Sequence, residues 1–222
     1  MNYSSFLNDD PRPLVLDTSV LINLNACTDG DRILRVIPNE IVIPQSVVRE
    51  LEHETSRKNG EHSFLHKLVA SGNVTLADMT EEEYALFADL TSGSRSLDDG
   101  EAATIAIATI RQTPCVVDEK KGRARATAIM NQHEPGWSLD LFRHPRVVAA
   151  LGVADSIDAL HLALRDGRMR IDSNHCNHVV SVIGVHRALE CNSLPGYRTR
   201  KLEWEQVVNQ ESSCVTHSDV QP

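Results

Sequence analysis

The stretch LVLDTSVLINL, residues 14–24, runs a short apolar segment into a single aspartate and then continues as an amphipathic segment. Leu14–Leu16 predict a buried strand, and Thr18 or Ser19 is suited to cap a helix that follows. Asp17 would then lie at the carboxyl end of a strand, which is where ligands bind in open α/β sheets. On this stretch alone Asp17 is more simply explained as a helix N-cap, so a site requires further acidic residues elsewhere in the chain.

Strand and helix patterns alternate along the rest of the chain. Short apolar runs predict strands at residues 41–43, 74–77 and 115–117, whereas ETSRKNGEH (54–62) is a polar break. Strands that alternate with helices form parallel βαβ units, so the sequence predicts an α/β fold with a central parallel sheet flanked by helices. The expected helices lie at 19–26, from Pro44 to Leu51, at 61–70, at 81–91 after a Thr80–Glu83 capping box, over GEAATIAIATIRQ (100–112), and directly after residue 118.

Composition limits the class of protein. The 222 residues are 41% hydrophobic and 24% charged, as in globular domains, and no apolar run is long enough to span a bilayer. The N-terminus lacks the basic and apolar regions of a signal peptide, and five scattered cysteines without a CxxC pair suit a reducing compartment. We therefore expect a cytoplasmic protein with no membrane association. The net charge of −9 argues against a general nucleic-acid-binding surface, although acids gathered around a metal would add to the same count.

Four acidic residues fall where the predicted topology gathers side chains. Asp17 and Asp118 end the first and fourth strands. Glu50 lies early in the helix after the second strand, and Glu101 begins the helix that leads into the fourth. Parallel strands place their carboxyl ends on one edge of the sheet, so we expect these acids to face one crevice. Clustered carboxylates repel one another unless a proton or a cation lies between them, and oxygen-only ligands suit Mg²⁺ or Mn²⁺.

The same segments resemble a known protein family. LVLDTSVLINL (14–24), IVIPQSVVREL (41–51), LDDGEAATIAIA (97–108) and VVDEKKGRARA (116–126) are similar, in order and spacing, to the successive acidic motifs of PIN-domain nucleases. The resemblance covers about residues 13–170, and four motifs in order are far more specific than one. It implies a compact α/β fold and, as in many members, an Mg²⁺- or Mn²⁺-dependent ribonuclease. Such members include the VapC-type toxins of bacterial toxin–antitoxin pairs.

Carried over by motif, the resemblance implies a role for each acid. The metal-binding and catalytic residues would be Asp17, Glu50, Glu101 and Asp118, and the residues that support them would be Thr18, Ser19 and Glu119. The implied mechanism is metal-assisted hydrolysis of RNA phosphodiester bonds, in which cations activate a water and neutralise charge developing on the phosphate. No nucleophilic side chain is required.

Basic residues beyond the fourth strand are candidates for contact with RNA phosphates. They lie just after Asp118, on the expected side of the crevice, and are Lys120, Lys121, Arg123 and Arg125. RDGRMR (165–170) and GYRTRK (196–201) are also basic, but are more simply explained as solvated surface charge.

Two other patterns compete with this assignment. Asp158, in DSIDALHLALRDGRMRI (155–171), would replace Glu101 as the third acid if a buried strand ending in an acid followed, but the next residues are polar. We therefore interpret Asp155 and Asp158 as first-turn acids favoured by the helix dipole. HCNH (175–178) offers soft ligands at a spacing that matches no standard zinc site, and we interpret it as a surface turn.

The sequence suggests three segments: a PIN-like nuclease domain over 13–171, a helical extension over 172–209 and a disordered tail over 210–222. In the extension, the apolar residues between Val179 and Leu189 predict one helix with a broad apolar face. Such a face has to pack on the protein's own core, on a second copy or on a partner protein.

Three functional hypotheses stay open at this point. The first is a metal-dependent ribonuclease that acts as a toxin controlled by an antitoxin. The second is a PIN nuclease in RNA processing or defence, and the third is a non-catalytic PIN-like module that binds RNA or a partner. Four intact acids disfavour the third. The candidate partners are RNA, an antitoxin protein and a second copy of the chain.

Overall fold

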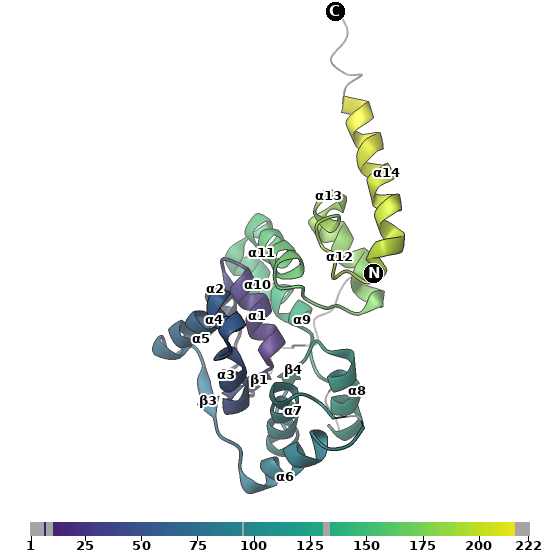
Figure 1. The fold of residues 1–222 in the computed structure, drawn as a ribbon. Helices are drawn as coiled ribbons and strands as arrows, with labels where there is room; N and C mark the ends of the chain where they lie inside the picture. The colour runs from purple at the N-terminus through teal and green to yellow at the C-terminus, as the bar shows by residue number, and fades with distance from the viewer. Residues whose placement is uncertain (1–6, 8–10, 95, 131–133, 216–222) are drawn as a thin grey trace, which may run out of the picture.

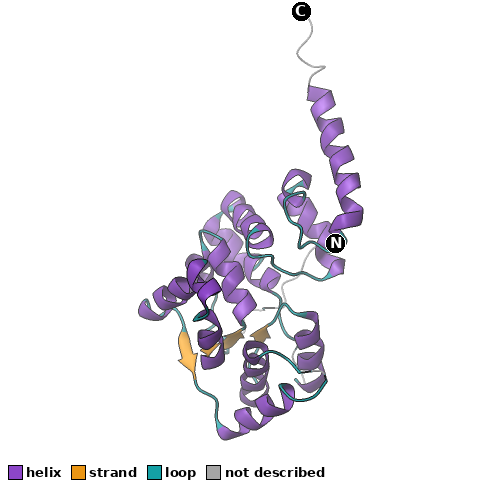
Figure 2. Ribbon diagram, in the orientation of Figure 1, coloured by secondary structure: helices purple, strands orange, loops and turns teal. Residues whose placement is uncertain are grey.

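The computed structural model describes residues 7, 11–94, 96–130 and 134–215. Within these ranges the strands form a parallel sheet in the order β3–β2–β1–β4. Helices enclose this small sheet on both faces (Figure 2). The strands are β1 (Leu14–Leu16), β2 (Ile41–Pro44), β3 (Thr75–Ala77) and β4 (Cys115–Val116).

The predicted elements before residue 130 are present, each with ends within one residue of those expected. They are the four strands, α1 (Thr18–Ala26), α3 (Gln45–Leu51), α5 (Glu61–Ala70), α6 (Glu81–Leu90), α7 (Asp99–Arg111) and α8 (Lys120–Ile129). Two short helices were not predicted, α2 (Gly30–Val36) and α4 (Glu54–Lys58). The polar break expected at residues 54–62 is therefore wrong over its first five residues, because a polar segment can form a short helix when it is solvent-exposed.

The sheet separates two apolar cores. Alternate residues of a strand point to opposite faces, so Leu14 and Leu16 enter one core and Val15 enters the other. The first core lies under α1, α2, α3 and α5, and the second under α6, α7 and α8 (Figure 1). Both faces of β1 are fully buried, which explains why it reads as a continuous apolar run.

The chain after β4 continues the sheet only briefly. Gly136 forms an isolated parallel bridge with Val116, and the segment that follows forms two short helices, α9 (Ser138–Phe142) and α10 (Pro145–Leu151). A longer helix follows, α11 (Val153–Arg165). In the described part of the chain no single helix is long and apolar enough to cross a membrane; α10 and α11 pass that test only as a pair bent by 114°.

The C-terminal extension differs from the single helix expected there. A short 3₁₀ turn (Ser173–His175) leads into α12 (Cys176–Ile183), and α13 (Val185–Ala188) follows separately. The break falls at Gly184, whose φ of 84° lies in the left-handed region and ends α12. Val179 and Ile183 are buried in the first core, so the apolar face packs on the protein's own core.

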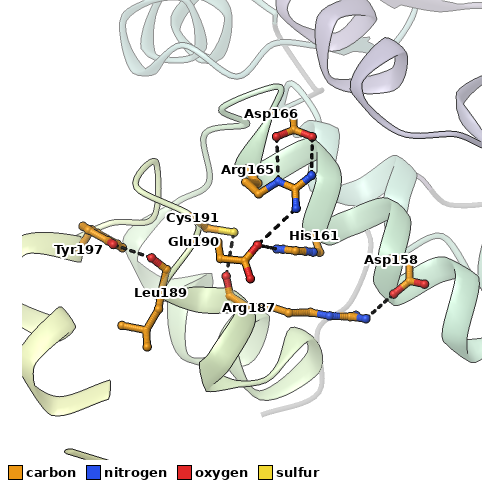
Figure 3. A network of polar contacts seen from close by, with 9 residues as sticks. All are labelled: Asp158, His161, Arg165, Asp166, Arg187, Leu189, Glu190, Cys191 and Tyr197. Carbon is orange, nitrogen blue, oxygen red and sulfur yellow. Dashed lines mark hydrogen bonds and ion pairs between the residues drawn. The ribbon is translucent and has the colours of Figure 1, made fainter. Parts of the chain in front are cut away.

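Polar contacts also join the extension to α11 (Figure 3). The Glu190 carboxylate lies 3.2 Å from His161 Nε2 and 3.3 Å from Arg165 Nη1. Arg187 forms an ion pair with Asp158 at 2.5 Å. Burial lowers the pKa of His161, while Glu190 opposes that change. Most of these side chains are at least one-third exposed, so we expect the apolar contacts to contribute more to the attachment of the extension.

The last helix is α14 (Tyr197–Val215), which projects away from the body of the molecule (Figure 1). Its first turns are held by Trp204, which is 7% exposed and contacts Tyr197 edge to face. The disordered tail expected over 210–222 is therefore wrong for residues 210–215, which are helical because α14 continues through them. The rest of that segment, 216–222, lies outside the described residues.

Candidate active site

A cavity of about 330 Å³ opens at the carboxyl edge of the sheet. The four acids expected to share a crevice all line it, and two further acids, Asp98 and Glu119, join them. The lining residues are Asp17, Thr18, Ser19, Ile22, Asn23, Glu50, Asp98, Glu101, Asp118, Glu119, Gly167, Arg168, Met169 and Arg170. The convergence follows from the topology, because β1 and β4 are parallel neighbours and α3 and α7 begin at the same edge.

Asp17 lies directly after β1 and caps α1. Its carboxylate accepts hydrogen bonds from the Ser19 backbone N–H at 3.3 Å and from Ser19 Oγ at 2.7 Å. The side chain is buried, and burial raises its pKa to about 7 against the opposing effect of the Ser19 hydroxyl. Asp17 therefore caps α1, and a nearby cation would stabilise the ionised form of its buried carboxyl group.

Glu50 reaches the cavity from α3. Thr18 donates its hydroxyl hydrogen to Oε2, and the backbone N–H of Gly100 donates to Oε1 at 2.6 Å. A Cβ at position 100 would lie 2.6 Å from Glu50 Oε2 and 2.7 Å from Thr18 Oγ1, so a side chain there would displace the Glu50 carboxylate or Thr18. Burial raises the pKa of Glu50, although both hydrogen bonds lower it.

Asp118, like Glu50, has a hydrogen-bond donor at each carboxylate oxygen. Asn23 Nδ2 donates to Oδ2 at 2.8 Å, and the Ser138 backbone N–H donates to Oδ1 at 2.7 Å. Asn23 also contacts Ser138 Oγ at 3.1 Å, so the two donors support each other. Burial raises the pKa of Asp118 to about 6 in spite of these bonds.

Glu101 has the least support. It begins α7, is 3% exposed, and its Oε1 is buried without a hydrogen-bond partner among the described residues. The side chain lies against Gly122, where a Cβ would come within 2.1 Å of that oxygen. Burial, and then the charge of Asp17, raises the pKa of Glu101 to about 8. A buried carboxylate oxygen without a donor is stabilised by a proton or by a cation.

The donor set fits a hard divalent cation, although the present arrangement does not enclose one. The acids supply oxygen atoms only, as Mg²⁺ or Mn²⁺ prefers, and Glu101 Oε1 is a buried oxygen without a hydrogen-bond partner in the part of the chain that the structure describes. Over the described ranges, however, no three acidic, histidine or cysteine side chains are arranged so as to hold an ion. Asp17, Glu50 and Asp118 each turn toward their own donors, which is what mutual repulsion between carboxylates favours.

The sequence comparisons agree with this geometry. A family model described as a PIN domain matches residues 13–132, more than half of the chain, and all four acids lie inside that match. The chain belongs to the PIN-domain family. PIN domains are typically nucleases and generally bind divalent metals, so membership indicates a nuclease. A comparison with curated proteins gave no match.

The basic residues of this PIN domain are not where the sequence suggested. None of Lys120, Lys121, Arg123 and Arg125 lines the cavity. Closeness to Asp118 in sequence was misleading, because α8 turns onto the face of the sheet that α6 and α7 cover. The four residues therefore do not line the cavity, although the charges of Lys121 and Arg123 lower the pKa values of Glu101 and Asp118, and their contact with RNA stays a prediction.

Three of the four have other contacts in the PIN domain. Arg123 donates to the backbone carbonyls of Val117 and Gly136, at 3.0 and 2.6 Å, and its guanidinium stacks 3.7 Å from the centre of the Trp137 ring. Arg125 pairs with Asp89 of α6 at 3.2 Å, and Lys121 bonds to the backbone carbonyl of Ser96. Lys120 is exposed.

Two arginines from RDGRMR line the cavity instead. Arg168 and Arg170 follow α11, in a segment interpreted from sequence as solvated surface charge and lying outside the matched PIN region. Arg170 forms an ion pair with Glu119 at 2.5 Å, which places Glu119 beside the site as expected. Asp158 does not line the cavity, in keeping with the choice of Glu101 over Asp158.

Sequence analysis also missed Asn23, Ser138 and the two glycines that make room for carboxylates. Asn23 left a detectable signal, because it is an amide on the buried side of an otherwise apolar α1. Ser138 left no comparable signal, since its backbone N–H could come from any residue except proline and its hydroxyl meets Asn23 and Asp118 only in the folded chain.

Proposed function

We propose that this PIN-domain protein is a divalent-metal-dependent endoribonuclease that hydrolyses RNA phosphodiester bonds. The observation that carries the proposal is the buried Oε1 of Glu101, which has no hydrogen-bond partner among the described residues, in a cavity lined by Asp17, Glu50 and Asp118. Mg²⁺ or Mn²⁺ held by these acids would supply an activated water and positive charge at the phosphate. The elevated pKa values of Asp17 and Glu101, both caused first by burial, support a site adapted to hold a cation.

The neighbouring residues have positioning roles in this proposal. Ser19 orients Asp17, and Thr18 together with the Gly100 N–H orients Glu50. Asn23 holds Asp118. These donors keep the carboxylates at the rim of one cavity despite their repulsion, as groups that orient metal ligands do.

The test is cleavage by the purified full-length chain of labelled single-stranded RNA, structured RNA and DNA, with Mg²⁺, with Mn²⁺ and after EDTA treatment. We expect cleavage of RNA only in the presence of metal, and a loss of at least about 100-fold in Asp17→Asn, since even residues that merely support metal ligands cost 10–100-fold. Asp158→Asn is the matched control, because Asp158 lies outside the cavity. Undiminished cleavage after EDTA would refute the metal mechanism, and cleavage of DNA alone would refute the substrate class.

We further propose that the nuclease acts in the cytoplasm as the toxin of a toxin–antitoxin pair. The support is the resemblance of its four acidic motifs to those of VapC-type toxins. Induced expression should then arrest growth, Asp17→Asn should abolish the arrest, and co-expression of a short neighbouring reading frame that encodes a DNA-binding protein should relieve it. Normal growth with active nuclease would favour RNA processing or defence instead. Sedimentation of the purified chain would test the homodimer.

A further inference from the structure

The turn that carries Arg168 is fixed rigidly against the site. The backbone N–H of Met169 donates to the Ala163 carbonyl at 3.0 Å, and the Met169 side chain is 1% exposed. On the other side, Gly167 lies so close to α1 that a Cβ would come within 2.8 Å of Asn23 Oδ1 and 3.0 Å of Asn23 Cα. Asn23 is the residue that holds Asp118. The turn therefore has a defined position relative to the acids.

Arg168 itself adopts an unusual backbone conformation. Its φ is 56°, in the left-handed region that disfavours residues with a side chain. In the described part of the chain Gln112, with φ 53° at the end of α7, is the other non-glycine residue of this kind. Glycine would adopt this backbone without steric cost. The Arg168 side chain is exposed and forms no hydrogen bond or ion pair with the described residues, so this backbone conformation is held by the bond from Met169 to Ala163 and not by the arginine side chain.

The charge around the cavity makes Arg168 distinctive. Six carboxyl groups line the cavity, and a negatively charged ligand would be repelled by them. Of the two arginines that line it, Arg170 is paired with Glu119 at 2.5 Å. Arg168 is the other, and its guanidinium is available to a ligand.

We propose that Arg168 binds a backbone phosphate of the RNA substrate beside the acidic centre. This inference rests on the proposed ribonuclease function. A guanidinium offers paired N–H donors that match two phosphate oxygens, and a phosphate contact holds RNA in register without selecting its bases. The rigid turn fixes the distance from this phosphate to the acids, so Arg168 positions the neighbouring phosphodiester bond over the metal-binding carboxylates.

The test compares Arg168→Gly with Gln112→Gly, because both substitutions relieve a positive φ and only the first removes a cavity residue. The dissociation constant of a labelled single-stranded RNA is measured by fluorescence anisotropy in Ca²⁺ at several salt concentrations. Removal of one charged contact is expected to weaken binding about tenfold. The slope of log affinity against log salt should fall by about 0.7, the value for one phosphate contact to a single strand.

Gln112→Gly should leave RNA binding unchanged, and thermal unfolding should show both variants folded, since relief of strain and the greater freedom of the unfolded chain oppose each other. Arg168→Lys should recover part of the affinity, because the charge stays and the paired donors are lost. If Arg168→Gly binds RNA as tightly as the unmodified chain does, and the unmodified chain cleaves RNA, this inference is overturned and the proposed function stands. Equal losses in both glycine variants overturn it as well. A wild-type chain that neither binds nor cleaves RNA overturns the proposed function, and this inference with it.

Discussion

Glu50 and Glu101 occupy space that two glycines leave open. A Cβ at Gly100 would overlap the Glu50 carboxylate, and a Cβ at Gly122 would overlap Glu101. Both glycines lie in the first turn of a helix, where glycine is not needed for backbone conformation. Room for a carboxylate explains these glycines, and neither residue takes part in the chemistry.

Removal of the charge from two buried glutamates, Glu101 and Glu83, should change the stability of the protein in opposite directions. We expect Glu101→Gln to raise the stability of the metal-free protein at pH 9 by on the order of 1 kcal/mol, because the pKa of Glu101 is raised to about 8 and its ionised form is unfavourable there. The same variant should lose cleavage and any stabilisation by metal. Urea unfolding in EDTA and in Mn²⁺ measures both effects.

Glu83→Gln is the matched control for Glu101→Gln. Glu83 is also buried, at 1% exposure, but Arg111 bonds to its carboxylate at 2.7 and 3.1 Å. Burial raises the pKa of Glu83, and the bonds from Arg111 and Thr80 outweigh burial and lower it. Glu83→Gln should therefore destabilise the protein by about 1–3 kcal/mol and leave cleavage intact. Stability changes of the same sign in both variants would contradict this account.

At the scale of elements, the PIN domain and the extension share one core. Buried residues of α12, α13 and the first turns of α14 belong to the same apolar cluster as β1 and α1. They are Cys176, Val179, Ile183, Ala188 and Trp204, and Cys191 and Leu194 of the connection between α13 and α14 belong to the same cluster. The family match ends at residue 132, so the chain needs helices outside the matched region to cover this face of its sheet.

Truncation tests this dependence. We expect a chain that ends at residue 171 to aggregate or to lose cooperative unfolding, because it exposes the surface that the extension covers. A chain that ends at residue 215 should keep the melting temperature and cleavage of the full chain. Val179→Ala should cost about 2 kcal/mol, whereas Glu190→Ala, at 50% exposure, should cost less than about 1 kcal/mol. A soluble, active chain ending at residue 171 would show the extension to be dispensable.

At the scale of the whole molecule, the acidic centre makes stability depend on pH and on metal together. Burial raises the pKa of Asp118 to about 6, of Asp17 to about 7 and of Glu101 to about 8, whereas such groups titrate near 4 in an unfolded chain. The folded state therefore binds more protons than the unfolded state between about pH 4 and pH 8. The stability due to these groups is fully present below about pH 4 and is lost as pH rises through 6 to 8.

A divalent cation should reverse that loss, because it binds the ionised carboxylates of the folded state. We expect stabilisation by Mg²⁺ or Mn²⁺ to be small at pH 5 and to grow toward pH 8, reaching about 3 kcal/mol when the metal is at 100 times its dissociation constant. Melting curves recorded with EDTA and with metal at each pH give the stabilisation due to metal. The contributions of the other titrating groups are the same in both curves and cancel in this difference. A metal effect independent of pH would contradict the assignment of these acids as ligands.

The order of the strands, the longer helices before residue 130, the parallel sheet and the gathering of Asp17, Glu50, Glu101 and Asp118 could be predicted from local patterns. Apolar runs, a capping box and helical periodicity depend on residues a few positions apart, and parallel strands bring their carboxyl ends to one edge whatever the side chains are. The acids therefore needed no knowledge of packing to be found.

The partners of those acids depended on contacts between distant segments. Asn23 meets Asp118 across 95 positions of the chain, and Gly100 meets Glu50 across 50. Arg168 enters the cavity because Gly167 packs on α1, whereas α8, which follows Asp118 directly, packs its apolar residues on the other face of the sheet, and its basic residues do not line the cavity. Sequence patterns indicate which face of an element is apolar, but the direction in which a helix leaves its strand is set by the packing of the whole core, and that direction placed the arginines.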